Sequence, residues 1–223
     1  MRKIIVGAQV SLDGIMQAPG GPTEDPTRGF KFGGWSMPFW GPESSEEINR
    51  LFEQEFDLLL GRKTYEIFAA YWPYYDESAP AGSVAKRFNE IKKYAVSRSA
   101  DFDRSWKGSV LLRGIADVER LKQEDGPALI TQGSTELVHT LLAQDLVDAL
   151  AVFTIPVVLG GGKKLFADGS APHSYKLSRS RVSSTGITIA HYDRDGDVKI
   201  ANAASREPSK AELERRERIQ REG

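Results

Sequence analysis

The sequence predicts an α/β protein with a central, mostly parallel β-sheet, flanking helices and a C-terminal antiparallel hairpin. Short apolar runs alternate with amphipathic segments, which is the pattern of parallel strands joined by crossover helices. The last two strand-like stretches, 175–184 and 187–195, meet around Thr185 and Gly186, which predicts an antiparallel pair at one edge of the sheet.

The first predicted strand (3–10) leads into a thirty-residue loop (11–40) that is rich in glycine and proline. A loop of this length inside a compact domain is usually either functional or disordered. Aromatic residues argue against disorder and favour a flap over a binding site. They are Phe30, Phe32, Trp35, Phe39 and Trp40.

The chain then alternates between the two kinds of element. The predicted segments are helix 43–56, strand 57–60, helix 64–72, helix 81–91, strand 92–97, strand 109–114, helix 115–125, strand 127–133 and helix 134–147. The apolar stretch DALAVFTIPVVL (148–159) follows, and we place it near an edge of the sheet. An uncovered apolar edge invites pairing, so we expect a homodimer.

The composition indicates one globular domain, residues 1–200, and a charged tail, residues 201–223. The tail has only Leu213 and Ile219 as large apolar residues beyond Ile200, so we expect either a fraying helix or disorder there. The chain has 40% hydrophobic residues and a net charge of −1, which leaves no electrostatic footprint for nucleic acid or an acidic membrane.

Several other classes of protein are excluded on composition. Cysteine is absent, which rules out disulfides and thiolate catalysis, and the three histidines are too scattered for a metal cluster, so no metal is expected. We find neither an apolar run of membrane-spanning length nor a signal peptide, and we therefore expect a cytoplasmic protein.

Three strand-to-helix junctions carry the same chemistry. Gly61-Arg62-Lys63-Thr64 follows the strand at 57–60, Ser97-Arg98-Ser99 follows the strand at 92–97, and Gln132-Gly133-Ser134-Thr135 precedes a helix. In parallel sheets, ligands bind beyond the carboxyl ends of the strands. Hydroxyls, backbone donors and arginines suit the phosphates of a nucleotide. The alternative is that these residues are ordinary helix caps.

The common nucleotide fingerprints are missing. The glycine-rich segment 159–166 resembles a P-loop, but Val157 stands where that motif needs glycine and Lys164 stands where it needs Ser or Thr. No G-x-G-x-x-G follows the first strand. A kinase or an ordinary Rossmann dehydrogenase is therefore not expected.

In order, the segments SLDG, LLLGRKTYE, VSRS, QGSTELVHTLLAQDLVDAL and PVVLGGGKKLF resemble the dihydrofolate reductase-like superfamily. Within it, they resemble the reductase domain of the bacterial riboflavin biosynthesis deaminase–reductase, as a stand-alone member. The resemblance covers about residues 2–193. It implies a dihydrofolate reductase-like fold, an NADPH site and often a homodimer.

The resemblance also implies roles for individual residues. Gly61, Arg62 and Thr64 would contact the phosphates of the cofactor. Ser97 and Arg98 would hold the 2′-phosphate of the adenosine ribose.

Two further groups of cofactor contacts follow from the same resemblance. Gly133, Ser134 and Thr135 would receive the pyrophosphate at a helix N-terminus. Ala8 and Ile15 would lie beside the nicotinamide.

The catalytic and substrate residues are less constrained. The cofactor carries the hydride, so the protein mainly positions the reactants. The proton comes from Asp13, Glu46 or ordered water, although Asp13 also fits a simple Asp-Gly turn. Trp35 and Trp40 of the aromatic loop and Gly161 of the glycine-rich turn are our candidates for substrate contacts.

We therefore expect an NADPH-dependent reductase of a pteridine, of 5-amino-6-(5-phosphoribosylamino)uracil or a similar pyrimidine, or of another small C=N or C=O compound. Dihydrofolate reductases hold their pteridine with a buried carboxylate on the helix after the first loop. None of Glu43, Glu46 and Glu47 clearly takes that place, which disfavours folate. The alternative is a nucleotide-binding regulatory or interaction protein that retains the cofactor site without turnover.

Overall fold

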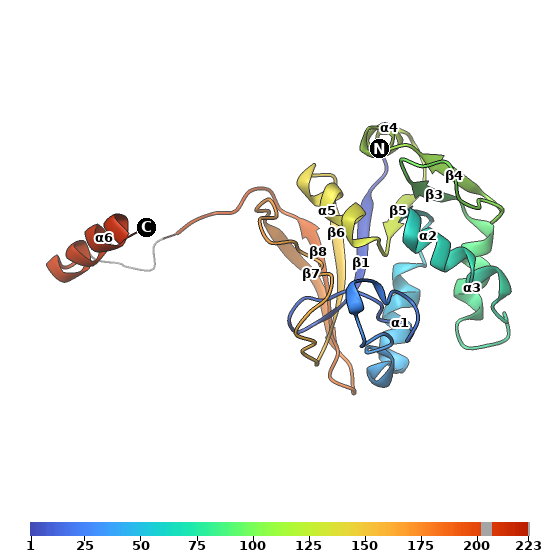
Figure 1. Ribbon diagram of the computed structural model, residues 1–223, viewed down its shortest axis with the longest axis horizontal. Helices are drawn as coiled ribbons and strands as arrows, with labels where there is room; N and C mark the ends of the chain where they lie inside the picture. Colours follow the sequence, from blue (N-terminus) through green and yellow to red (C-terminus); the bar gives the residue numbers. More distant parts are fainter. Residues whose placement is uncertain (202–206, 223) are drawn as a thin grey trace.

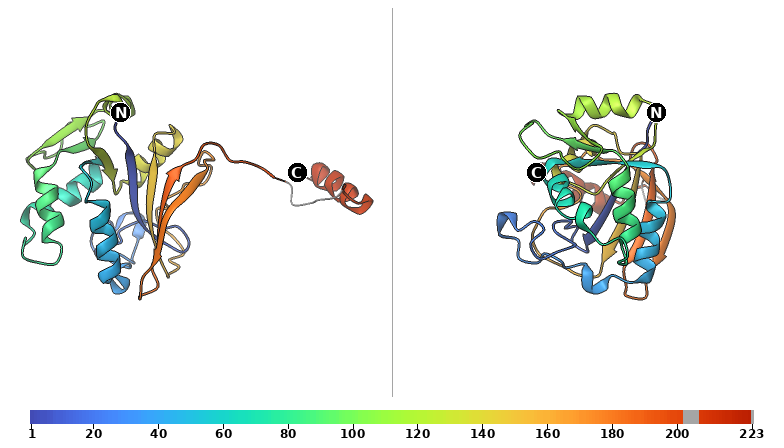
Figure 2. Two further views of the ribbon diagram at one scale, coloured as in Figure 1. Left: turned by 180° about the vertical axis from the view of Figure 1, so that it is seen from behind. Right: turned by 90° about the vertical axis from the view of Figure 1, so that its right-hand side faces the viewer.

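The structure, a computed structural model, describes residues 1–201 and 207–222. Its sheet has the strand order β4-β3-β2-β5-β1-β6-β8-β7 (Figures 1 and 2). The strands are β1 Ile4–Ser11, β2 Phe56–Gly61, β3 Lys93–Val96, β4 Ser109–Leu112, β5 Ala128–Thr131, β6 Ala149–Ile155, β7 Tyr175–Val182 and β8 Thr188–Arg194. Strands β1 to β6 pair in parallel, whereas β8 is antiparallel to β6 and to β7. The predicted sheet and its antiparallel hairpin are confirmed.

Helices cover both faces of the parallel part (Figures 1 and 2). The helices are α1 Pro42–Leu51, α2 Arg62–Ala69, α3 Gly82–Glu90, α4 Ile115–Gln123, α5 Thr135–Ala143 and α6 Lys210–Glu222, with short 3-10 turns η1 Thr27–Gly29, η2 Met37–Phe39 and η3 Trp72–Tyr74. Val6 and Leu129 face α4 and α5 in one core cluster, and Leu58 and Ile130 face α1, α2 and α3 in the other. Alternation along each strand sends successive side chains to opposite helical layers.

The long loop between β1 and α1 closes over the β6–β8 end of the sheet. Its residues Trp35 and Trp40 join Phe153 and Ile189 in a third apolar cluster, where the Trp40 and Phe153 rings stack 5.8 Å apart. The buried Gln17 side chain holds the loop from inside, because it donates to the Asp25 and Thr27 carbonyls and accepts from the Lys163 N–H. The aromatic residues thus build a packed layer.

Three predicted helix boundaries are wrong. Helix α1 ends at Leu51, and Phe56 opens strand β2. Helix α2 begins at Arg62 with Gly61 as its N-cap, so Thr64 does not cap it. Helix α5 ends at Ala143, and the positive φ of 50° at Asp145 turns the chain toward β6.

The apolar stretch at 148–159 does not lie at an edge. Strand β6 pairs with β1 on one side and with β8 on the other, and its residues Leu150, Phe153 and Ile155 are buried. The two edge strands are β4 and β7, and on β7 the charged Lys176 and Arg179 discourage pairing. The argument for a homodimer from an apolar edge is therefore wrong, and the homodimer itself stays a prediction.

Residues 202–206 and 223 of the predicted tail lie outside the described residues. Helix α6 has no buried residue, and the division of the chain at residue 200 stays a prediction. None of the helices in residues 1–201 and 207–222 combines the length and the apolar composition needed to cross a bilayer.

Candidate functional site

A cavity of about 1860 Å³ opens at the carboxyl ends of β2, β3 and β5, beside the second half of β1. The long loop, the first turns of α2 and α5, and the inner faces of α1 and α3 complete its walls. Ligands of parallel α/β sheets bind at this edge because loops and helix N-termini converge there.

All three predicted junctions line this cavity. Arg62 and Thr64 come from the start of α2, Ser97 and Arg98 follow β3, and Ser134 precedes α5; Gly61, Gly133 and Thr135 line it as well. Strands β3, β2 and β5 are consecutive in the sheet, which explains why segments so distant in sequence meet. The structure thus brings together all eight cofactor residues predicted at these junctions.

Four hydroxyl groups of these junctions are free, whereas the Ser99 hydroxyl accepts the Asp101 N–H at 3.0 Å. Ser134 is the N-cap of α5, yet its side chain makes no capping hydrogen bond. In the described part of the chain, the hydroxyls of Thr64, Ser97 and Thr135 likewise donate to no protein group. The first N–H groups of α2 and α5 also lack partners inside their helices. Donors converge here without internal acceptors, which fits an anionic ligand better than ordinary capping.

Glycine allows two of the junctions to touch. The Gly61 N–H donates to the Gly133 carbonyl at 3.1 Å. A Cβ on Gly61 would lie 3.0 Å from the Ser134 nitrogen, and a Cβ on Gly133 would lie 2.9 Å from the Thr64 Oγ1. The peptide bond between Gly133 and Ser134 is cis. Larger residues would fill the space in which the backbone donors lie.

Asp13 does not line the cavity. Its carboxylate accepts from the Ser11 hydroxyl at 2.6 Å and from the N–H groups of Leu159 and Gly160. The Ser11 hydrogen bond, with help from the two N–H donors, lowers the pKa of Asp13 to about 2. Asp13 therefore holds the glycine-rich turn against β1, and a carboxylate so acidic has no proton to give at neutral pH.

The residues predicted to contact the nicotinamide or the substrate fall into two groups. Ala8 and Trp40 line the cavity. Ile15 is buried beside Lys164, Trp35 is buried with its indole N–H on the Gln17 carbonyl, and Gly161 is exposed on the turn. These last three do not line the cavity, and their contacts with cofactor or substrate stay predictions.

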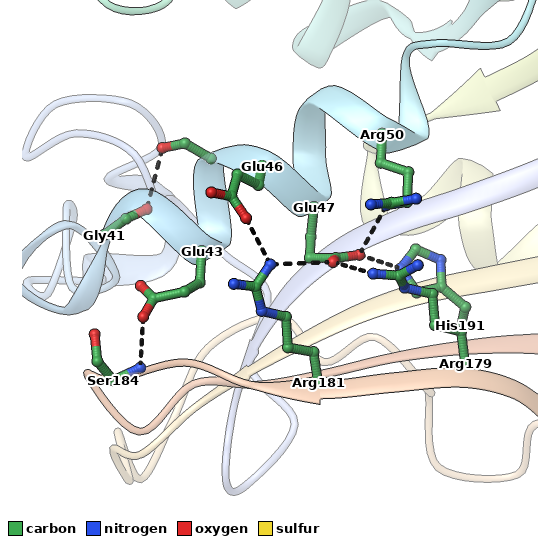
Figure 3. Close-up of polar contacts among 10 residues, drawn as sticks. Gly41, Glu43, Glu46, Glu47, Arg50, Arg179, Arg181, Ser184 and His191 are labelled. Atoms are coloured by element: carbon green, nitrogen blue, oxygen red, sulfur yellow. Dashed lines mark hydrogen bonds and ion pairs between the residues drawn. The ribbon is translucent and has the colours of Figure 1, made fainter.

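Glu46 also lies outside the cavity. Its side chain is 62% exposed and pairs with Arg181 of β7 at 2.7 Å (Figure 3). The neighbouring Glu47 is completely buried, but it points toward the antiparallel hairpin, where Arg179 donates to it at 2.5 Å and His191 lies 3.6 Å away. Figure 3 shows these carboxylates on the side of α1 that faces β7 and β8. Glu46 therefore does not line this cavity, and its catalytic role stays a prediction.

Burial raises the pKa of Glu47, but the hydrogen bond and charge of Arg179, with Arg181 and Arg50, outweigh it and leave the pKa below its ordinary value. Burial lowers the pKa of His191, and the charge of Glu47 opposes that shift only in part. The hydrogen bond from Arg179 to Glu47 fastens α1 to the hairpin.

Among the cavity residues that the sequence did not mark, Gln9 and Glu24 have unusual polar environments. Gln9 of β1 lines the cavity, and its buried Oε1 has no hydrogen-bond partner among the described residues. Glu24 of the long loop also lines it and accepts the N–H groups of Gly20 and Gly21 at 2.7 and 3.1 Å. Burial raises the pKa of Glu24 despite these two hydrogen bonds. The strand period would have placed Gln9 on this face, whereas no local signal marks Glu24.

Fold and cavity together define a dihydrofolate reductase-like α/β protein. The chain belongs to the RibD C-terminal domain family, whose model matches residues 2–189. This confirms the resemblance inferred from the sequence. Two curated relatives from Bacillus subtilis (strain 168) are uncharacterized. YyaP is 26% identical over 199 residues, covering 87% of this chain and 96% of its own length, and YwjB is 26% identical over 197 residues, covering 86% and 98%.

Solved structures share the fold at low identity. A putative riboflavin biosynthesis protein from Shewanella sp. PV-4 is 18% identical, with a TM-score of 0.61 over 86% of this chain and 99% of the other. Dihydrofolate reductase from Enterococcus faecalis, complexed with NADP(H), is 12% identical, with a TM-score of 0.53 over 86% and 96%.

Proposed function

We propose that the protein is an NADPH-dependent reductase that transfers a hydride to a small pteridine- or pyrimidine-like, or other C=N or C=O, substrate. The observation that carries this proposal is the convergence of three donor-rich junctions on one cavity. Four of their hydroxyls, on Thr64, Ser97, Ser134 and Thr135, make no hydrogen bond with the described residues. The family and the NADP(H) complex of the dihydrofolate reductase neighbour support it.

The residues present fit the cofactor. Arg98 is exposed at the rim and forms no ion pair within the described residues, so its guanidinium is free for the 2′-phosphate. Ser134 and Thr135 offer hydroxyls and N–H groups of a helix N-terminus to the pyrophosphate. When bound, NADPH supplies the hydride.

The chain itself contributes orientation and a proton. Among residues 1–201 and 207–222, four carboxyl side chains line the cavity, namely Glu24, Asp25, Glu136 and Asp168. Asp25 pairs with Lys163 at 2.5 Å, and Glu136 and Asp168 are exposed. Glu24 remains as the half-buried carboxyl with a raised pKa, and we assign the proton donor to it in place of Asp13 and Glu46.

Tryptophan fluorescence tests the proposal directly, because Trp40 and Trp72 line the cavity. We expect NADPH to quench this fluorescence at micromolar concentration and to bind more tightly than NADH. Loss of NADPH absorbance with a member of a pterin and pyrimidine panel would establish turnover. Binding without oxidation by any acceptor would favour a regulatory protein, and a failure to bind either cofactor would reject the assignment.

A further inference from the structure

The cavity extends from the junctions into an arm between α1, α2 and α3. Its wall is apolar and aromatic, with Trp40, Ile48, Phe52, Phe68, Trp72 and Phe88 as its main residues. Apart from Arg62 and Lys63 in the first turn of α2, every residue that these helices and η3 contribute to the wall is uncharged. A charged substituent would lose its hydration in the arm without gaining a partner.

Gln9 lies on the strand face that looks toward this arm. Gly7 and Gln9 point to the same side of β1, because side chains alternate along a strand. A Cβ on Gly7 would meet the Leu51 side chain of α1 at 3.1 Å, which identifies that side as the α1 face. The Gln9 amide therefore borders the arm next to Ala8, which also lines the cavity.

The Gln9 amide is unsatisfied. Its Oε1 is buried without a partner, and its Nε2 donates to no group in the part of the chain that the structure describes. A buried polar group without a hydrogen bond is costly, so we expect an ordered water or a ligand to pair with this one. A primary amide presents an acceptor and a donor side by side. Its complement is a ring edge with an N–H beside a C=O.

We propose that Gln9 selects the substrate by pairing with an N–H/C=O edge of an uncharged planar ring, whose uncharged substituent fills the aromatic arm. This rests on the proposed function, since it names the substrate class of that reductase. A ring without the N–H leaves the amide unpaired and is rejected. An unpaired buried polar group discriminates between ligands more strongly than a missing apolar contact does.

Calorimetric titration of the NADPH complex with three probes tests this inference. The probes are 6-methylpterin, its N3-methyl derivative, which lacks the ring N–H, and 6-carboxypterin, which carries a charge into the arm. We expect 6-methylpterin to bind about tenfold more tightly than either of the others. Gln9→Met should bind 6-methylpterin and its N3-methyl derivative about equally. Its NADPH affinity should stay within about threefold of that of the unmutated protein.

Two further variants complete the design. Gln9→Leu also removes both the acceptor and the donor of the amide. It should lose the preference in the same way, so it tests the inference if Gln9→Met fails to fold. Gln144→Met changes an exposed glutamine outside the cavity and should keep the preference intact. If the folded Gln9 variants bind NADPH and keep the preference unchanged, this inference is overturned while the proposed function stands. The same holds if 6-methylpterin, lumazine and 6-methyluracil all fail to bind below about 1 mM. Absence of NADPH binding to the unmutated protein would instead reject the proposed function.

Discussion

Gly61 lies directly against Ser134. Its N–H donates to the Gly133 carbonyl at 3.1 Å, and a Cβ at position 61 would lie 3.0 Å from the Ser134 nitrogen and would overlap the Ser134 hydroxyl. Because Gly61 caps α2 and Ser134 caps α5, this contact brings two helix N-termini to one point. The positive ends of both helix dipoles then face the same ligand.

Gly61→Ala should therefore separate the two helix termini. We expect a loss of about 1–3 kcal/mol in the free energy of unfolding and about ten- to a hundredfold in NADPH affinity, measured by urea denaturation and fluorescence titration. Gly161→Ala is the matched control, since its new Cβ meets nothing within 4 Å and lies outside the cavity. Equal effects of the two substitutions would contradict the role of the contact.

Arg98→Ala should erase the preference for NADPH over NADH. A charge-assisted hydrogen bond from arginine contributes about 1.5–3 kcal/mol, or about ten- to a hundredfold in affinity. NADH binding should hardly change, because NADH lacks the 2′-phosphate. Arg62→Ala should weaken both cofactors if Arg62 serves the pyrophosphate. Lys86→Ala, on the outer side of α3, is the control. An unmutated protein that binds both cofactors equally would refute the assignment of Ser97 and Arg98.

The cofactor side of the cavity was predictable because it depends on local order. A strand end, a glycine and a helix start are consecutive in sequence at Gly61 and again at Gly133, and parallel pairing brings such ends to the same edge. The parallel direction of the strands and their order along the chain were predictable from the alternation of apolar runs with amphipathic helices. The insertion of β5 between β2 and β1 left no local trace in the sequence.

The carboxylates were not predictable, because their partners are distant. Glu47 stays acidic despite its burial mainly because Arg179, 132 residues later on β7, donates to it. Asp13 is acidic partly because Leu159 and Gly160, which are distant in sequence, donate to it. Residue type alone marks Asp13, Glu46 and Glu24 as equal candidates. The loop that separates them has no period from which their orientation follows.

Glu24→Gln tests the proton donor. The raised pKa of Glu24 means that the protonated form persists above the ordinary value of 4.5 and is lost as the pH rises through the raised pKa. Turnover of the unmutated protein should therefore fall as the pH rises through the pKa of Glu24. Glu24→Gln should turn over slowly at every pH and show no such fall. Ionised Glu24 disfavours folding, so the variant should be at least as stable at neutral pH. Glu136→Gln, an exposed cavity carboxyl, should retain the unmutated pH profile.

Deletion of residues 201–223 should leave the domain intact. Helix α6 has no buried residue, and the exposed fractions of Leu213 and Ile219 are 48% and 51%. Helices of this length depend on packing for most of their stability, and α6 contributes none to the core. We expect the Tm to shift by no more than about 2–4 °C, which corresponds to about 1 kcal/mol in a domain of this size. A larger shift, or precipitation of the shortened chain, would contradict this division of the chain.

The Glu47–His191 contact should make the protein sensitive to acid in two steps. His191 is neutral in the fold, with a pKa below 6.5, whereas in the unfolded chain it takes up a proton near 6.5, so stability falls as the pH drops below 6.5. Glu47 stays ionised in the fold, with a pKa below 4.5, so a second loss begins below 4.5 and continues through its folded pKa. Urea midpoints measured from pH 7.5 downward should show both steps. His191→Gln should remove the first, and Glu47→Gln should remove the second at a cost of about 1–3 kcal/mol, because Arg179 loses its charged partner. A first step that survives in His191→Gln would assign it to another group.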